Sequence, residues 1–131
     1  MKKILVILLL FVSGTMLAQK VKFKKDKIVL DGEKVLSFER ENLGMIFTVY
    51  SLNGEDELIF MQYNRNATEN YDDDDYLKIL FLDSEVLIES NSLRDDTWKS
   101  VMRLLFKNKV LNKAGEINLK SLRKFKLKYQ F

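Results

Sequence analysis

The feature that most restricts the fold is an Asn53-Gly54 pair set between two runs of β-forming residues, GMIFTVYSL and ELIFMQYN. Asparagine and glycine tolerate the positive φ that a tight hairpin needs, so the two runs are predicted to pair as antiparallel neighbours. Asp31-Gly32 supplies the same turn chemistry between KIVLD and KVLSFER. YLKILFLD and EVLIES continue the series, which predicts an antiparallel meander sheet of five or six strands.

The predicted strands are apolar on both faces. In YLKILFLD, one face holds Leu77, Ile79 and Phe81, and the other holds Tyr76, Lys78, Leu80 and Leu82. ELIFMQY is again largely apolar on both sides. Such strands are expected to be covered on both faces, by helices, by another sheet or by a partner.

The C-terminal third predicts two helices. Ser92 is a candidate N-cap for the first, whose opening turn would hold Asp95 and Asp96 near the positive end of the helix macrodipole. Asn118 would cap the second, although the alternating tail KFKLKYQF (124–131) also fits a final strand. The expected apolar stripes are Trp98, Val101, Met102 and Leu105 on the first helix, and Leu119, Leu122, Phe125 and Tyr129 on the second. We therefore expect an α+β domain, with the two C-terminal helices packed on one face of the sheet.

The first 18 residues have the pattern of a secretory signal peptide. Met1-Lys2-Lys3 is a short basic segment, and the apolar run from Ile4 to Val12 is shorter than the about 20 residues needed to span a bilayer. Cleavage is expected after Ala18, which leaves residues 19–131 as a single domain. Because no cysteine follows the apolar run, the expected destination is the periplasm or the exterior, without a lipid anchor. The alternatives are a buried N-terminal strand and an uncleaved anchor.

The LAQ ending on a short lysine-led signal resembles the export signals common in Bacteroidota. The segments YSLNGEDELIF and LLFKNKVLNKAGEINLKSLRKF resemble parts of small exported proteins of unknown function from that group. This resemblance is consistent with export and implies no activity and no site residues.

The composition excludes several chemistries. The chain has no cysteine and no histidine, which removes disulfides, thiolate nucleophiles, zinc–thiolate sites and every arrangement that uses histidine as the base. Catalysis by two carboxylates, as in glycoside hydrolysis, stays open as a third hypothesis, with Glu57, Glu85 or Glu89 as candidates. No catalytic motif and no cofactor is indicated, so we do not expect an enzyme.

The charges are unevenly distributed along the sequence. Residues 28–96 carry an excess of acidic groups, while residues 19–27 and 97–131 carry an excess of lysine and arginine. This asymmetry predicts either an acidic part folded against a basic part, or two surfaces with different partners. The candidate anion-binding residues are Lys99, Arg103, Lys107, Lys120, Arg123, Lys124 and Lys128.

Four consecutive aspartates, Asp72, Asp73, Asp74 and Asp75, precede the YLKILFLD run. Calcium takes six to eight oxygen ligands, but consecutive residues do not all point at one ion. The favoured interpretation is a solvated turn that keeps the neighbouring strand from pairing edge to edge. Weak calcium binding and docking of a basic partner remain alternatives.

The sequence as a whole favours an exported, non-catalytic protein-interaction module of the cell envelope. Its partner would be another envelope or secreted protein, or a second copy of the chain, because two short helices cannot cover every apolar strand face. The main alternative is binding of an anionic polymer or a membrane surface through the basic C-terminal helices.

Overall fold

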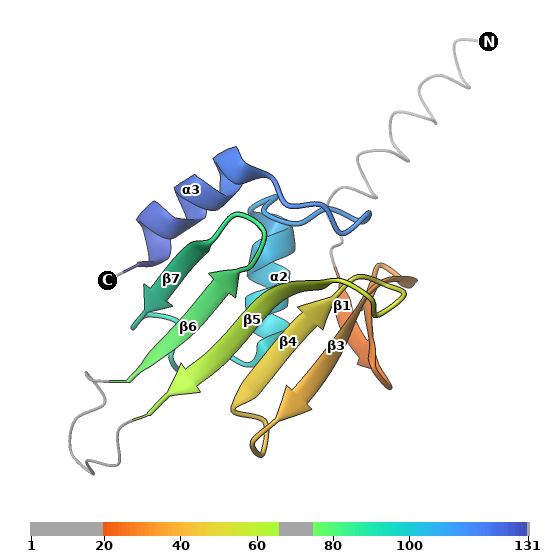
Figure 1. Cartoon of the computed structure of the whole chain (residues 1–131), viewed down its shortest axis with the longest axis horizontal. Helices are drawn as coiled ribbons and strands as arrows, with labels where there is room; N and C mark the ends of the chain where they lie inside the picture. Colours follow the sequence, from red (N-terminus) through yellow and green to blue (C-terminus); the bar gives the residue numbers. More distant parts are fainter. Residues whose placement is uncertain (1–19, 66–74, 131) are drawn as a thin grey trace, which may run out of the picture.

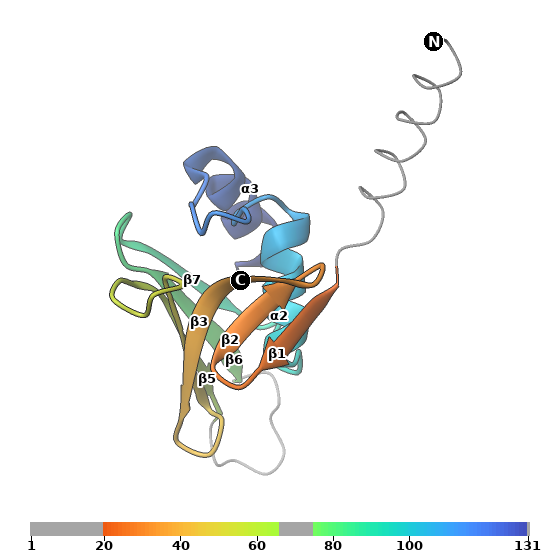
Figure 2. The same ribbon diagram turned by 90° about the vertical axis from the view of Figure 1, so that its right-hand side faces the viewer.

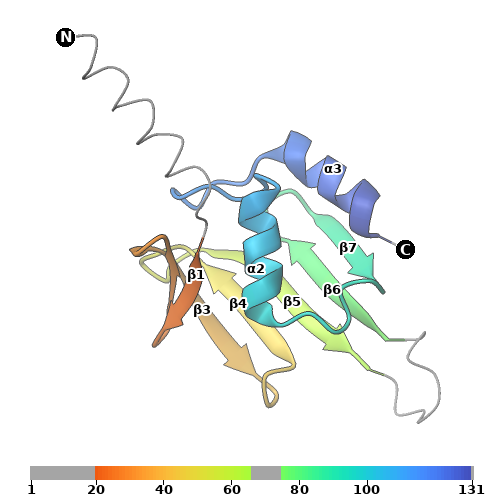
Figure 3. The ribbon, with the colours of Figure 1, turned by 180° about the vertical axis from the view of Figure 1, so that it is seen from behind.

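The computed structural model describes residues 20–65 and 75–130, which form an antiparallel sheet with two helices on one of its faces (Figures 1 and 3). The expected signal segment 1–18 lies outside the described residues. In the described part the strands are β1 Val21–Lys24, β2 Lys27–Leu30, β3 Glu33–Glu41, β4 Ile46–Tyr50, β5 Glu57–Asn64, β6 Tyr76–Phe81 and β7 Val86–Ser90, and the helices are α2 Trp98–Lys107 and α3 Leu119–Tyr129. The predicted α+β class and the antiparallel meander are confirmed.

Each described strand hydrogen-bonds to the strand next to it in sequence, in the order β1-β2-β3-β4-β5-β6-β7. Both predicted turn pairs connect strands of this meander, with Gly32 at φ 85° and Gly54 at φ 79°. The Asn53 side-chain oxygen accepts a hydrogen bond from the Glu55 amide at 3.1 Å, which stabilises the turn between β4 and β5. The hairpin chemistry of the sequence therefore sets the connectivity of the sheet.

The described sheet has seven strands rather than the predicted five or six, because β1 was not expected. Val21 pairs with Leu30 and is buried, and Phe23 packs against the core. Lys22 and Lys24 alternate with these residues and are exposed. Because of these lysines, the sequence indicates only a basic segment here and not a strand. Charged residues on an edge strand also oppose pairing with another chain.

The core lies between the sheet and the helices. Figure 2 shows the sheet bending so that β1 comes alongside α2, while α3 lies against β7. All four members of the expected α2 stripe are buried. On α3, Leu122 and Phe125 are buried as expected. Leu119 was expected in the same stripe, but it is 50% exposed and lies outside the core. The sheet contributes the fully buried side chains Phe47, Ile59, Met61, Leu77, Ile79, Phe81 and Ile88.

The two helix starts differ in how well the sequence predicts them. Asn118 caps α3 as expected, since its side chain accepts a hydrogen bond from the Ser121 amide at 3.0 Å. The cap of α2 is Thr97, which accepts from the Ser100 amide at 3.1 Å, so the assignment of Ser92 was wrong. Ser92 lies in a turn after β7, and both aspartates expected in the first turn precede the helix. The tail is helical through Tyr129, as favoured over a strand.

Candidate functional site

The face of the sheet opposite the helices, here called the outer sheet face, is the first candidate surface. Strand register places Phe60, Leu80 and Leu87 side by side across β5, β6 and β7. All three are half-buried, and no described helix lies over them (Figure 1). We call these three residues the outer apolar patch. The expectation that apolar strand faces are covered is therefore met on the inner face alone within the described chain.

Carboxylates border the outer apolar patch on its β3 side. The Tyr50 hydroxyl donates a hydrogen bond to Glu39 Oε2 at 3.2 Å. Partial burial, followed by the charges of Glu39, Glu57 and Glu41, raises the pKa of Tyr50 above its ordinary value. On the other side, Lys78 of β6 pairs in register with Glu89 of β7. The surroundings of the patch are thus predominantly acidic.

The predicted anion-binding residues lie on the helices, away from the outer sheet face. Lys99, Arg103 and Lys107 are exposed along α2. On α3 the exposed cations flank Leu127, whose exposed fraction is 86%. The α3 cations of the prediction are Lys120, Arg123, Lys124 and Lys128, and all are exposed. Within the described chain, both ion pairs join sequence neighbours, Asp26 to Lys27 and Arg94 to Asp95, so none links the sheet to a helix. This arrangement favours two separate charged surfaces over an acidic part folded against a basic part.

The metal and catalytic candidates are not assembled into a site by the described residues. Asp72, Asp73 and Asp74 lie outside the described part, while the backbone carbonyl of Asp75 accepts a hydrogen bond from Asn91 Nδ2 at 2.8 Å. The described residues contain no group of three or more acidic side chains placed to hold a metal ion. Of the three glutamates considered for catalysis, Glu57 begins β5, Glu85 lies in the turn before β7, and Glu89 lies within β7.

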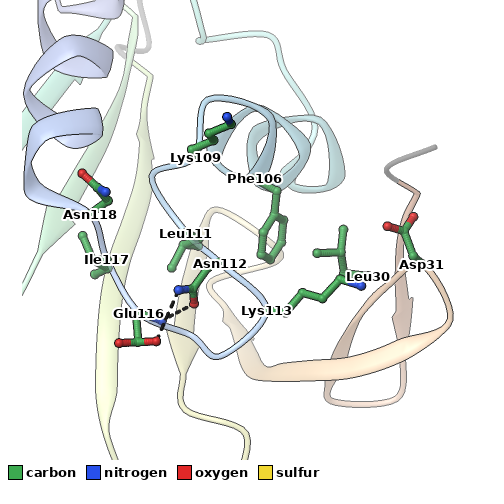
Figure 4. A pocket seen from close by; sticks show the side chains of 10 residues that line it. All are labelled: Leu30, Asp31, Phe106, Lys109, Leu111, Asn112, Lys113, Glu116, Ile117 and Asn118. Atoms are coloured by element: carbon green, nitrogen blue, oxygen red, sulfur yellow. Dashed lines mark hydrogen bonds between the residues drawn. The ribbon is translucent and has the colours of Figure 1, made fainter. Parts of the chain in front are cut away.

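A pocket of about 490 Å³ lies at the C-terminal end of α2 (Figure 4). Its apolar lining comes from Leu30, Phe106, Leu111 and Ile117. The polar groups of the adjoining loop largely bond to one another, since Asn112 Oδ1 accepts from the amides of Ala114 and Glu116 at 3.0 and 2.9 Å. On the opposite wall, Asp31 Oδ1 accepts from the Lys20 amide at 2.8 Å. These polar groups hold the loop and the chain start in place, and Lys109 and Lys113 are the cations that line the pocket.

A second pocket of about 490 Å³ lies at the other end of α2, beside Trp98. Three aromatic rings line it, Phe23 of β1, Tyr63 of β5 and Trp98 of α2. Phe38 of β3 and Phe47 of β4 pack against these rings from the core. Arg40 and Arg65 also line it, with their guanidinium groups over the rings of Phe23 and Tyr63. The sequence gives no sign of this pocket, because its residues are far apart in the chain and form no local motif.

Within the described residues, no helix is both long enough and apolar enough to cross a membrane. A scan of known protein-family models, a search of curated proteins and a search of solved structures each find no match for this chain.

Proposed function

We propose that this chain is an exported, non-catalytic interaction module that binds a partner protein on its outer sheet face. The observation that carries the proposal is the outer apolar patch, in which Phe60, Leu80 and Leu87 form a continuous row with no described helix over it. The neighbouring inner-face residues of the same strands, such as Ile59 and Ile79, are fully buried. Apolar residues gathered on an uncovered sheet face are typical of an interaction site.

The charges around the patch indicate the chemistry of the partner. Glu39, Glu41 and Glu57 surround Tyr50 on one side, and Glu89 faces Lys78 on the other. A partner with an apolar centre and a basic rim would be complementary to this surface. The same carboxylates would repel phosphate-bearing polymers and anionic lipid headgroups, so this face favours a protein partner.

Helix α3 supports a second candidate function, which is binding to an anionic surface. Leu127 is almost fully exposed between Lys126 and Lys128, and Leu119 is half exposed beside Lys120. Leucines set among lysines and arginines on a helix favour adsorption to the headgroup region of an anionic membrane. This surface lies on the helical side of the molecule, so the two candidate functions can be tested with different substitutions.

The test is affinity capture from a cell-envelope extract with the tagged full chain and two variants. Leu80→Ser changes the outer apolar patch, and Leu43→Ser is the matched control, since Leu43 is a fully exposed leucine in the β3–β4 turn. The proposal expects a protein that the wild type and the control retain at both low and moderate salt, and that Leu80→Ser loses. Capture of the same proteins by all three chains would contradict it.

Two further arms separate the alternatives. Binding of anionic lipid or nucleic acid that disappears between about 50 and 200 mM salt, and that Leu127→Ser weakens, would favour the α3 surface instead. Concentration-dependent dimerisation that Leu80→Ser abolishes would identify a second copy of the chain as the occupant of the outer sheet face.

Export is tested separately. The secreted or periplasmic protein should begin at Gln19, which N-terminal sequencing measures.

A further inference from the structure

The pocket beside Trp98 is lined by three aromatic rings, those of Phe23, Tyr63 and Trp98. Behind this lining, Phe38 stacks on Phe47 with centroids 4.9 Å apart, and Phe47 stacks on Trp98 at 5.2 Å. Phe23 closes the group on the β1 side, 4.8 Å from Phe38. The Tyr63 and Trp98 centroids lie 4.1 Å apart. A lining of aromatic rings suits a flat apolar ligand.

The polar atoms of the wall residues are already bonded to the backbone. The Trp98 indole N–H donates to the Gly44 carbonyl at 2.8 Å. The Tyr63 hydroxyl donates to the Asp96 carbonyl. Both rings are therefore fixed in orientation before any ligand arrives, which reduces the entropy lost on binding. The polar recognition of a ligand must come from other side chains.

Two arginines supply that recognition. The guanidinium of Arg40 lies 5.3 Å from the Phe23 centroid and 5.5 Å from the Phe38 centroid, and that of Arg65 lies 5.3 Å from the Tyr63 centroid. A guanidinium that lies over an aromatic ring keeps N–H groups with which it can bind a carboxylate. Neither arginine has a hydrogen bond or an ion pair with another described residue. Both line the same pocket as the cation Lys99.

The acidic groups of the pocket compensate for these cations in part. Asp95 Oδ2 lies 3.6 Å from Arg94 Nε, and Asp96 Oδ2 accepts a hydrogen bond from Ser100 Oγ at 3.4 Å. Among the described residues that line the pocket, three cationic side chains therefore face two carboxylates. The remaining positive charge favours an anionic ligand over a neutral or cationic one.

We propose that this pocket binds a small anion with a flat apolar body, of which an aryl carboxylate is the simplest example. The carboxylate would bond to the N–H edges of Arg40 and Arg65, and the ring would lie against Trp98 and Phe23. This site uses the inner face of the sheet and the start of α2, so it is separate from the outer apolar patch. It stands or falls independently of the protein partner.

The test uses the indole of Trp98, the only tryptophan in the sequence. Its N–H gives one signal in a nitrogen–proton NMR spectrum of the labelled full chain. Benzoate is the probe, with benzyl alcohol as the neutral ring control and acetate as the anion without a ring. We expect benzoate to shift the indole signal in a saturable way, with an affinity at least about tenfold above that of either control.

Substitutions identify the groups responsible. Arg40→Gln and Arg65→Gln should each weaken benzoate binding by about tenfold or more, because each removes a charge-assisted hydrogen bond. Arg103→Gln is the matched control, an exposed arginine on α2 that does not line the pocket. Signal dispersion in each spectrum shows whether the variant is folded. Equal shifts with benzoate and benzyl alcohol, unchanged binding in both pocket variants, or no saturable shift with benzoate would overturn the proposal.

Discussion

The rings of Tyr63 and Trp98 lie 4.1 Å apart, and this contact fastens the middle of the sheet to the first turn of α2. The Tyr63 hydroxyl donates to the carbonyl of Asp96, two residues before the helix. The Trp98 indole donates to the carbonyl of Gly44, in the turn between β3 and β4. The position of the helix start is thus set by ring packing and by two hydrogen bonds that bridge distant parts of the chain.

The first prediction concerns alkaline stability. Burial raises the pKa of Tyr63 from 10.0 to about 12. Because the folded state holds the proton more tightly, this group stabilises the fold fully below pH 10, and the contribution is lost as the pH rises toward 12. The loss should be on the order of 2 kcal/mol in the free energy of unfolding. Chemical denaturation of the wild type at a series of alkaline pH values measures it.

Tyr63→Phe is the control for this effect. The variant should lose about 1 kcal/mol of stability at neutral pH, because the Asp96 carbonyl loses its donor. It should also lack the part of the alkaline decline that belongs to this hydroxyl. Parallel curves for wild type and variant above pH 10 would show that the tyrosine does not titrate differently in the two states.

The second prediction compares two glycines that have nearly the same positive φ. Gly54 and Gly115 have φ of 79° and 77°, but a Cβ at Gly54 would meet open space, whereas one at Gly115 would lie 3.0 Å from Leu36 Cδ2. Each alanine substitution should cost about 1 kcal/mol through the left-handed conformation. Gly115→Ala should cost about 1 kcal/mol more, because Leu36 is fully buried and has little room to move. Thermal unfolding of both variants measures the difference, and equal losses would contradict it.

A third prediction distinguishes the two faces of β6. Ile79 is fully buried on the inner face, while its neighbour Leu80 is half-buried on the outer face. Ile79→Ala should therefore lower the free energy of unfolding by about 3 kcal/mol, and Leu80→Ala by less than about 1 kcal/mol. Denaturant titration measures both. A comparable loss at Leu80 would mean that the outer face is covered in the free protein.

The fourth prediction tests the start of α2. Thr97→Ala should cost about 1 kcal/mol, because it removes the acceptor for the Ser100 amide. Ser92→Ala should leave the helix start unchanged, because Ser92 lies in the preceding turn and its hydroxyl bonds to the buried Ser90 Oγ at 3.0 Å. Hydrogen exchange of the Ser100 amide in the two variants decides between these caps, since Thr97→Ala should speed it and Ser92→Ala should not. Faster exchange in Ser92→Ala alone would contradict the assignment of Thr97.

Local chemistry made much of the fold predictable. The pairs Asp31-Gly32 and Asn53-Gly54 predict turns because few other residues tolerate positive φ. The apolar stripe of α2 recurs with a helical period, which predicts the helix. Strand β1 was not predicted because the segment is short and rich in lysine. Its apolar residues, Val21 and Phe23, are recognisable as core residues only once β1 is seen to pack beside α2. Ser92 was misassigned because a cap depends on where the helix begins, and the chain forms a turn after Ser92, with Leu93 buried, before α2 starts.

The candidate sites were harder to predict than the fold. Strands that are apolar on both faces, with only two helices to cover them, predicted an uncovered apolar surface. Which face the helices cover depends on packing across the whole domain. The pocket beside Trp98 could not be read from sequence, because Phe23, Arg40 and Tyr63 come from three different strands. Arg40 lies in the acidic segment 28–96, and nothing in the neighbouring sequence predicts that its guanidinium lies over the rings of Phe23 and Phe38.

The sequential order of the strands has a consequence for how the chain folds. Every described strand pairs with its neighbour in sequence, so the sheet can grow hairpin by hairpin across connections of two to eleven residues. The inner face, however, has no cover until α2 and α3 arrive, and both follow the last described strand. If the chain becomes available for folding from its N-terminus, the apolar inner face of the sheet would stay exposed to water until the C-terminal helices form. Interrupted delivery of that last portion would leave an aggregation-prone intermediate rather than a smaller stable domain.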